Sequence, residues 1–138
     1  MSNNTEIVTI ALDFDGTVVE NVYPDMGKDV PLAANTLRIL HQFGYKIILY
    51  TMRSGDLLDF AVEWFKERKI PLYGIQFDPT QHEWSSSNKC YADLIIDDRA
   101  FGCPLIKYES FERPVVNWVQ VANMLLHSKY EHRYGGGV

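Results

Sequence analysis

The feature that most constrains this chain is an apolar run that ends abruptly in two carboxylates. Residues 7–12 read IVTIAL and residues 13–17 read DFDGT. A short run rich in Ile and Val is typical of a strand in a parallel sheet that is covered on both faces. Two aspartates close together at its end repel each other and lose hydration, and a divalent cation offsets both costs. The sequence therefore predicts a buried strand that ends in a cation-binding pair, Asp13 and Asp15.

The rest of the chain alternates apolar runs with amphipathic segments. Further strands are predicted at 45–51, 72–77 and 92–96, a fifth edge strand at 104–108, and helices at 31–44, 54–69 and from Pro114 to Leu126. Such alternation implies right-handed crossovers. We therefore expect an α/β fold, a Rossmann-like doubly wound parallel sheet of about five strands with helices on both faces.

Two longer segments carry signals for irregular structure. Residues 17–29 contain Pro24 and Gly27, which favour a turn and a partly extended flap over a helix, and residues 78–88 form a polar loop with Pro79 and three consecutive serines. Neither leaves room for a second domain of the usual size. The 138 residues are expected to form a single domain, with residues 1–5 and 131–138 frayed.

Polar side chains follow three of the predicted strands. Asp13 and Asp15 follow the first, Thr51 the second, and Asp97 and Asp98 the fourth. The carboxyl ends of parallel strands meet at one edge of the sheet, where ligands bind in such folds. We therefore expect these five side chains to share one site.

Charge and cysteine content narrow the class of protein. The net charge of -5 argues against a nucleic-acid binder that works by charge alone. Cys90 and Cys103 show neither CxxC spacing nor histidine partners, so we expect neither a disulfide scaffold nor a zinc site. No signal-peptide pattern and no apolar run of about 18 residues is seen, so a cytoplasmic protein without a membrane segment is expected.

The ordered acidic motifs resemble those of the haloacid dehalogenase superfamily of phosphohydrolases. The resemblance rests on DFDGT after the first strand, Thr51, a lysine, and the Asp97-Asp98 pair, and it covers residues 7–108. It implies a Rossmann-like hydrolase domain, Mg²⁺ as cofactor, and hydrolysis of a phosphomonoester. The short segments that follow Asp15 and precede the fourth strand resemble those of capless members.

The resemblance also implies a role for each residue of the motifs. Asp13 would attack phosphorus to form an aspartyl phosphate, and Asp15 would act as general acid and base. Gly16 would let the backbone turn its N–H groups toward the phosphate, and the Thr51 hydroxyl would donate to a phosphoryl oxygen. Lys89, eight residues before Asp97, is predicted to neutralise phosphoryl charge, and a solvated lysine of the loop is its alternative.

Two arginines lie next to these motifs. Arg53 resembles the arginine that meets substrate phosphate in capless polynucleotide 3'-phosphatase domains, and a surface salt bridge is its alternative. Arg99 is expected to form an ion pair with the neighbouring carboxylates.

The family's metal site is carried over as Asp13, the backbone carbonyl of Asp15, and the Asp97-Asp98 pair. Of that pair, Asp98 is the expected direct ligand, and Asp97 would bond to Lys89 or to a metal-bound water. Oxygen ligands of this kind suit Mg²⁺.

Other functions use similar residues. A phosphoacceptor signalling domain of the receiver type also combines acidic residues, a Thr and a Lys on a parallel sheet, but it expects its acceptor aspartate after the third strand, where this chain has Asp78-Pro79. A non-catalytic phosphate-binding module is a further alternative. The expected partner is a phosphorylated small molecule or the end phosphate of a nucleic acid, and no protein partner is indicated.

Overall fold

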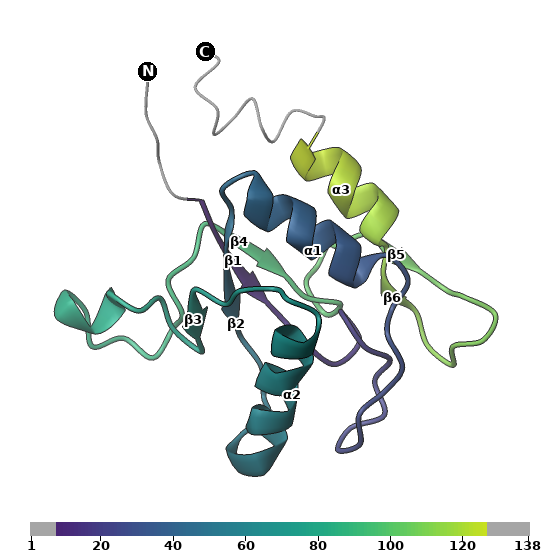
Figure 1. Ribbon diagram of the computed structural model, residues 1–138, viewed down its shortest axis with the longest axis horizontal. Coiled ribbons are helices and arrows are strands. Elements are labelled where there is room, and N and C mark those ends of the chain that lie inside the picture. The colour runs from purple at the N-terminus through teal and green to yellow at the C-terminus, as the bar shows by residue number, and fades with distance from the viewer. Residues whose placement is uncertain (1–7, 127–138) are drawn as a thin grey trace.

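A parallel sheet of four strands is the centre of the computed structural model, which describes residues 8–126 (Figure 1). Its strands lie in the order β3-β2-β1-β4. Their bounds are Thr9–Leu12 for β1, Lys46–Leu49 for β2, Gly74–Ile75 for β3 and Leu94–Ile96 for β4. Leu12 is in register with Leu49 and with Ile96, so the residues that follow these three strands reach the same edge of the sheet. The expected α/β fold is confirmed at this level.

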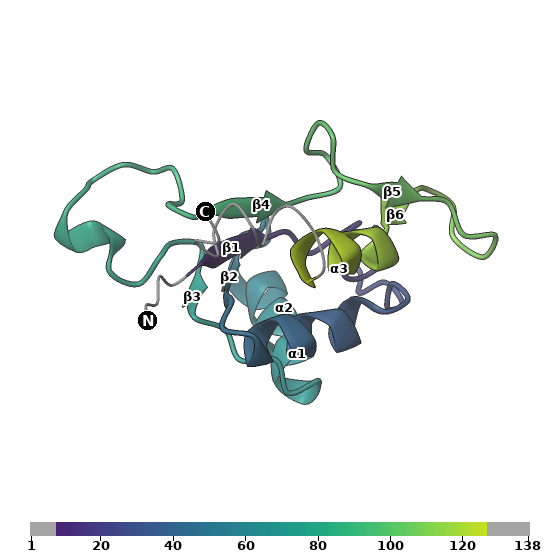
Figure 2. The ribbon, with the colours of Figure 1, turned by 90° about the horizontal axis from the view of Figure 1, so that it is seen from above.

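The three α-helices of residues 8–126 all cover one face of the sheet (Figure 2). They are α1 (Ala33–Gln42), α2 (Gly55–Glu67) and α3 (Trp118–Leu126). Ile10 and Leu12 alternate with Ala11 along β1 and point toward them. The main core joins these two residues to apolar side chains of the helices, among them Leu37, Leu40, Ala61, Trp64, Phe65, Trp118, Val121 and Leu125. The prediction of helices on both faces is therefore wrong.

The opposite face is covered by the connection between β3 and β4. β3 and β4 lie on opposite sides of β1, so this connection has to cross the sheet. It contains a 3₁₀ turn at Gln81–Glu83 and no α-helix. Cys90 packs there against Ala11 and Ile48 in a second, smaller core. A connection that contains Pro and consecutive serines does not form an amphipathic helix. This explains why the α-helices cover only the other face of the sheet.

The segment predicted as a fifth strand of the main sheet lies outside it. β5 (Leu105–Ile106) pairs antiparallel with β6 (Val115–Val116) in a separate two-stranded sheet. The last helix accordingly begins at Trp118 instead of Pro114. The β-branched pair at 115–116 prefers an extended backbone, which explains both differences.

The flap predicted between the first strand and the first helix is confirmed. The Glu20 N–H donates to the Lys28 carbonyl at 2.8 Å and the Val30 N–H to the Val18 carbonyl at 2.9 Å. Asp29 attaches the flap to α2 by accepting a hydrogen bond from the Trp64 indole at 2.9 Å. The ends predicted to fray lie outside the described residues. Within residues 8–126, none of the helices has the length and apolarity that a bilayer crossing requires.

Candidate functional site

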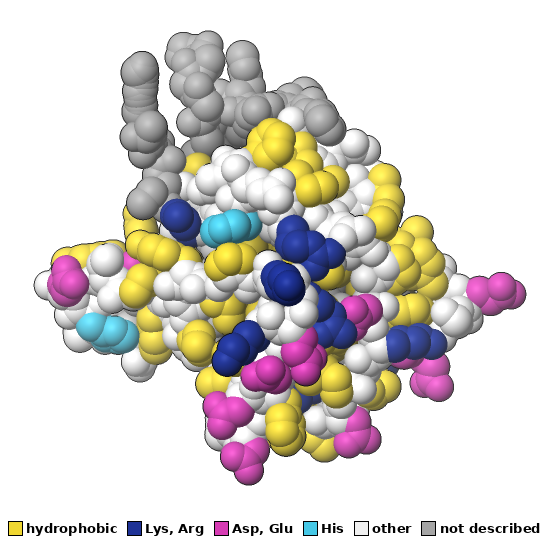
Figure 3. Space-filling view, viewed as in Figure 1, with side chains coloured by type: hydrophobic (Ala, Val, Ile, Leu, Met, Phe, Trp, Pro, Cys, Tyr) yellow, Lys and Arg dark blue, Asp and Glu magenta, His cyan; other side chains and the backbone are white. Residues whose placement is uncertain are grey.

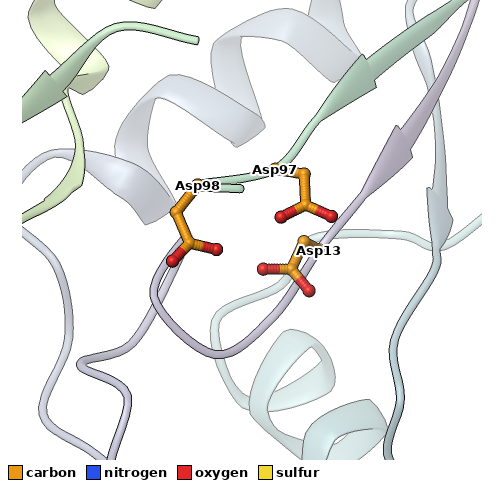
Figure 4. A group of neighbouring side chains, drawn as sticks. All are labelled: Asp13, Asp97 and Asp98. Atoms are coloured by element: carbon orange, nitrogen blue, oxygen red, sulfur yellow. The ribbon is translucent and has the colours of Figure 1, made fainter. Parts of the chain in front are cut away.

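Three carboxylates converge at the carboxyl edge of the sheet (Figure 4). Asp13 directly follows β1, and Asp97 and Asp98 follow β4. Each offers an oxygen that lies within 4.8 Å of those of the other two, and all three side chains are half-buried. The Asp13 N–H donates to the Ile96 carbonyl at 3.0 Å, so the strand pairing itself places Asp13 beside Asp97. We call these three residues the acidic cluster.

Burial makes a negative charge on the cluster costly. The pKa of Asp13 is raised from 3.8 to about 8: burial is the largest cause, the charges of Asp97 and Asp98 contribute to the rise, and a hydrogen bond from Thr17 acts against it. Burial also raises the pKa of Asp98, while the positive charge of Arg99 acts in the opposite direction. Protein groups alone therefore leave Asp13 mostly protonated near neutral pH.

A divalent cation fits this donor set. Carboxylate oxygens are the ligands that hard cations such as Mg²⁺ and Ca²⁺ prefer, and a bound cation favours the ionised carboxylates that burial disfavours. The cluster could therefore hold a metal ion. Asp97 and Asp98 both belong to the acidic cluster, whereas the sequence favoured Asp98 alone as the direct metal ligand. The backbone carbonyl of Asp15 as a ligand stays a prediction.

Thr17 is a functional residue that sequence reasoning missed. Its fully buried hydroxyl donates to Asp13 Oδ2 at 2.8 Å and accepts from the Asp98 N–H at 3.2 Å. Its carbonyl accepts a hydrogen bond from the Trp118 indole at 2.8 Å, which connects α3 to the site. One hydroxyl thus orients two members of the cluster. Its place in DFDGT is the only sequence signal, and the bonds themselves depend on tertiary structure.

Position 16 requires a glycine, because its backbone lies very close to the acidic cluster. Its φ is +86°, and a Cβ there would collide with the Asp98 carboxylate. Its N–H donates to the Val19 carbonyl at 2.7 Å, so this particular amide is already engaged. Among residues 8–126, the N–H groups of Phe14 and Asp15 have no acceptor. These two amides are the free donors directly after Asp13.

Asp15 is not a member of the acidic cluster and pairs with Arg53 instead. Arg53 Nε and Nη2 donate to the two carboxylate oxygens, each at 2.8 Å, and the arginine side chain is only 1% exposed. Nη2 also donates to the Asp25 carbonyl at 2.9 Å, and the guanidinium lies over the rings of Phe14 and Tyr23. The surface salt bridge considered for Arg53 is thus a buried one that joins Asp15 to the flap.

Thr51 lies at the expected edge, one residue beyond Tyr50, whose N–H donates to the Leu12 carbonyl at 2.8 Å. Gln76 holds its backbone from both sides: Oε1 accepts from the Thr51 N–H at 2.9 Å and Nε2 donates to the Thr51 carbonyl at 2.7 Å. The Thr51 hydroxyl accepts from the Arg53 N–H at 3.1 Å and keeps its own proton to donate. Nothing in the sequence pointed to Gln76.

The structure does not bring Lys89 to the acidic cluster. Its exposed side chain lines a separate hollow beside Trp84 and Tyr91, on the crossover that covers the second face of the sheet. No lysine is among the groups that shift the pKa of Asp13. The predicted bond between Asp97 and Lys89 is also absent from the described part of the chain, where the Asp97 carboxylate accepts from the Arg99 N–H at 2.9 Å.

Comparison with known proteins finds a relative among the solved structures. No protein-family model matches the chain, and no curated protein does. The structure of a conserved protein coded by a locus from Bacteroides thetaiotaomicron matches with a TM-score of 0.73 and 37% sequence identity, over 87% of this chain and 90% of that one. Identity at this level over nearly the whole of both chains shows common descent. The chain therefore belongs to the family of this conserved Bacteroides protein.

Proposed function

We propose that this protein is a Mg²⁺-dependent phosphatase that hydrolyses a phosphomonoester through a covalent aspartyl phosphate on Asp13, the chemistry of the haloacid dehalogenase superfamily that its sequence resembles. The observation that carries the proposal is the convergence of the three cluster carboxylates, with Asp13 as the member that directly follows β1. Thr51 at the same sheet edge supports it. Receiver-type signalling receives less support, because Asp78, the aspartate that follows β3, is not a member of the acidic cluster.

Asp13 would act as the nucleophile. Its carboxylate oxygen attacks phosphorus, the bond from phosphorus to the ester oxygen breaks, and the departing alcohol takes a proton from Asp15. Water then attacks the aspartyl phosphate, returns a proton to Asp15 and releases inorganic phosphate. The free N–H groups of Phe14 and Asp15 and the hydroxyl proton of Thr51 can donate to phosphoryl oxygens. Thr17 holds the Asp13 carboxylate through its 2.8 Å hydrogen bond.

Asp13, Asp97 and Asp98 would hold the Mg²⁺ ion. When bound, the ion would supply positive charge that neutralises the phosphoryl group and keeps Asp13 ionised. Since no lysine of residues 8–126 joins the cluster, we assign to the ion the charge neutralisation that the sequence assigned to Lys89.

Arg53 would hold the Asp15 carboxylate in place. Both carboxylate oxygens of Asp15 already accept hydrogen bonds from Arg53, so one of these bonds must open before Asp15 can meet the leaving group. Transfer of a proton to the leaving group therefore requires the loss of a hydrogen bond of this pair. Substrates whose leaving group departs readily as an anion depend less on this step, and we expect the enzyme to favour them.

The charge distribution supports a small substrate over a nucleic acid. The net charge is -5. On the face shown in Figure 3, acidic side chains gather over the lower end of α2 and Lys and Arg side chains lie above them, so this face carries both signs of charge. Binding a nucleic-acid backbone depends on a clustered basic surface.

Hydrolysis of p-nitrophenyl phosphate with Mg²⁺ and with EDTA tests the proposal. We expect Mg²⁺-dependent turnover in the wild type, and loss of at least about a thousandfold in Asp13→Asn, because the nucleophile is removed. Asp15→Asn should cost less with this substrate than with an alkyl phosphate, because p-nitrophenolate needs no proton to leave. Asp59→Asn on α2 removes an exposed carboxylate and serves as the control.

Three outcomes separate the proposal from its alternatives. Mg²⁺-dependent turnover that survives in Asp13→Asn would exclude Asp13 as the nucleophile. A phosphorylated protein that accumulates after incubation with acetyl phosphate, without release of inorganic phosphate, would indicate a phosphoacceptor domain instead. Binding of phosphate with neither turnover nor phosphorylation would indicate a non-catalytic module.

A further inference from the structure

A cavity of about 320 Å³ lies next to the acidic cluster. Its walls come from the flap, the residues after β4, the start of β5 and the segment that leads into β6. Its polar lining consists of Glu20, Asn21, Asp98, Arg99, Glu112 and Arg113. This volume is at the lower end of the range for small-molecule sites. Nothing in the mechanism above uses the cavity.

Asp98 connects the cavity to the acidic cluster, because it lines the cavity and is also a member of the cluster. A phosphoryl group held at the cluster therefore has this cavity as its neighbour. Whatever is attached to the ester oxygen can extend into it, so the cavity is suited to bind the part of the substrate that does not react.

Two arginines supply positive charge to the cavity. Within residues 8–126, Arg99 and Arg113 form no ion pair, contrary to the expectation for Arg99. Glu20 is engaged, because its carboxylate lies 3.8 Å from Lys28 Nζ and accepts from the Glu112 N–H at 3.3 Å. The two other carboxylates of the lining, Asp98 and Glu112, form no ion pair in that range either. Asp98 would be held by the Mg²⁺ ion of the acidic cluster, and in that state two guanidinium groups face one free carboxylate, that of Glu112.

We propose that this cavity binds a second anionic group of the substrate, so that the preferred substrate is a small phosphomonoester that also carries a carboxylate or a second phosphate. The proposal rests on the proposed phosphatase function. Guanidinium groups present several N–H donors in a planar fork, which matches the two oxygens of a carboxylate or phosphate. The limited volume favours a small molecule over a nucleic-acid strand.

Three substrates of equal chain length test this inference in the full chain with Mg²⁺. Propyl phosphate has a neutral tail, 3-phosphonooxypropanoate carries a carboxylate, and propane-1,3-diyl bisphosphate carries a second phosphate. We expect a KM that is roughly tenfold lower for at least one of the two anionic compounds than for propyl phosphate, the size of one charge-assisted hydrogen bond. The comparison between those two identifies the anion.

Two substitutions with opposite expected signs make the test specific. Arg113→Gln should raise the KM for the anionic compound roughly three- to tenfold, leave kcat unchanged and leave propyl phosphate unaffected. Glu112→Gln should lower the same KM, because it removes the opposing charge. Lys66→Gln, an exposed charge on α2 outside the lining, is the control and should change neither.

An equal KM for all three compounds would overturn the inference, as would an Arg113→Gln effect of the same size on propyl phosphate. A lower KM for a 3'-phosphorylated oligonucleotide than for every small compound would assign the cavity to nucleic acid instead. If no phosphate ester is hydrolysed, the phosphatase proposal fails. Binding of the same compounds, measured by calorimetry, then still tests whether the cavity binds an anionic group. Tighter binding of the bisphosphate than of propyl phosphate, lost in Arg113→Gln, supports the anion site, and equal binding refutes it.

Discussion

Replacing Asp13 by Asn should stabilise the metal-free protein while it abolishes its response to Mg²⁺. The ionised Asp13 carboxylate is half-buried, and its nearest acidic neighbours are Asp97 and Asp98. Asparagine removes the charge and keeps an oxygen that can accept the hydrogen bond of Thr17. The substitution therefore relieves desolvation and repulsion with little change in shape.

The magnitude follows from the raised pKa of Asp13. A shift from 3.8 to about 8 corresponds to at most about 6 kcal/mol when Asp13 is fully ionised. Because the side chain keeps some contact with water, we expect about 1–3 kcal/mol, or a rise in Tm of roughly 3–10 °C at pH 8.5 in EDTA.

The pH dependence has a defined sign. Since the pKa of Asp13 is raised to about 8, the native state binds more protons than the unfolded state between about pH 4 and pH 8. The free energy of unfolding of the metal-free wild type should therefore fall as pH rises through this window, and Asp13 alone contributes at most about 1.4 kcal/mol per pH unit. Asp13→Asn should reduce this slope and leave the part that comes from Asp98, whose pKa is also raised.

Thermal unfolding from pH 5 to 8.5, in EDTA and in Mg²⁺, measures all of these effects. In Mg²⁺ the wild type should gain stability most at high pH, where Asp13 is free of its proton, and Asp13→Asn should gain none. Asp59→Asn should behave as the wild type does throughout. A lower Tm for Asp13→Asn in EDTA at pH 8.5, or an undiminished response to Mg²⁺, would refute this reasoning.

Two further predictions concern Arg53 and Lys89, whose surroundings in the structure differ most from those that the sequence predicts. Arg53→Met should lower the free energy of unfolding by about 3 kcal/mol, because Asp15 is left half-buried without its partner. In a double-mutant cycle with Asp15→Asn, measured by urea denaturation, the double mutant should lose much less stability than the sum of the two single losses. Additive losses would contradict a direct pair. Lys89→Ala should leave kcat and KM for p-nitrophenyl phosphate within about twofold of the wild type, because its exposed side chain lies outside the acidic cluster. A loss of a hundredfold or more would return Lys89 to the catalytic role that its motif suggests.

The sequence alone determined the elements whose signals are local. The apolar runs located β1, β2 and β4, and the helical periodicity located α1 and α2. Both signals lie within a few consecutive residues, which is why the sequence alone contains them. The rule that parallel strands end at one edge then sufficed to bring Asp13, Asp97 and Asp98 together. A short motif and a topological rule therefore predicted the acidic cluster.

Only the tertiary structure decided what depends on the path of the chain between elements. The crossover from β3 to β4 contains no α-helix, so one sheet face carries all three helices and Lys89 lies in a hollow apart from the cluster. Asp15 and Arg53, like Thr17 and Asp98, are distant in sequence and meet only in the folded chain. Thr17 reaches Asp13 because the backbone turns between them. Periodicity describes which side of an element is buried, but it does not specify which distant side chain meets a given carboxylate. For that reason the sequence predicted which acids form the cluster, and the fold determined which other residues hold them in place.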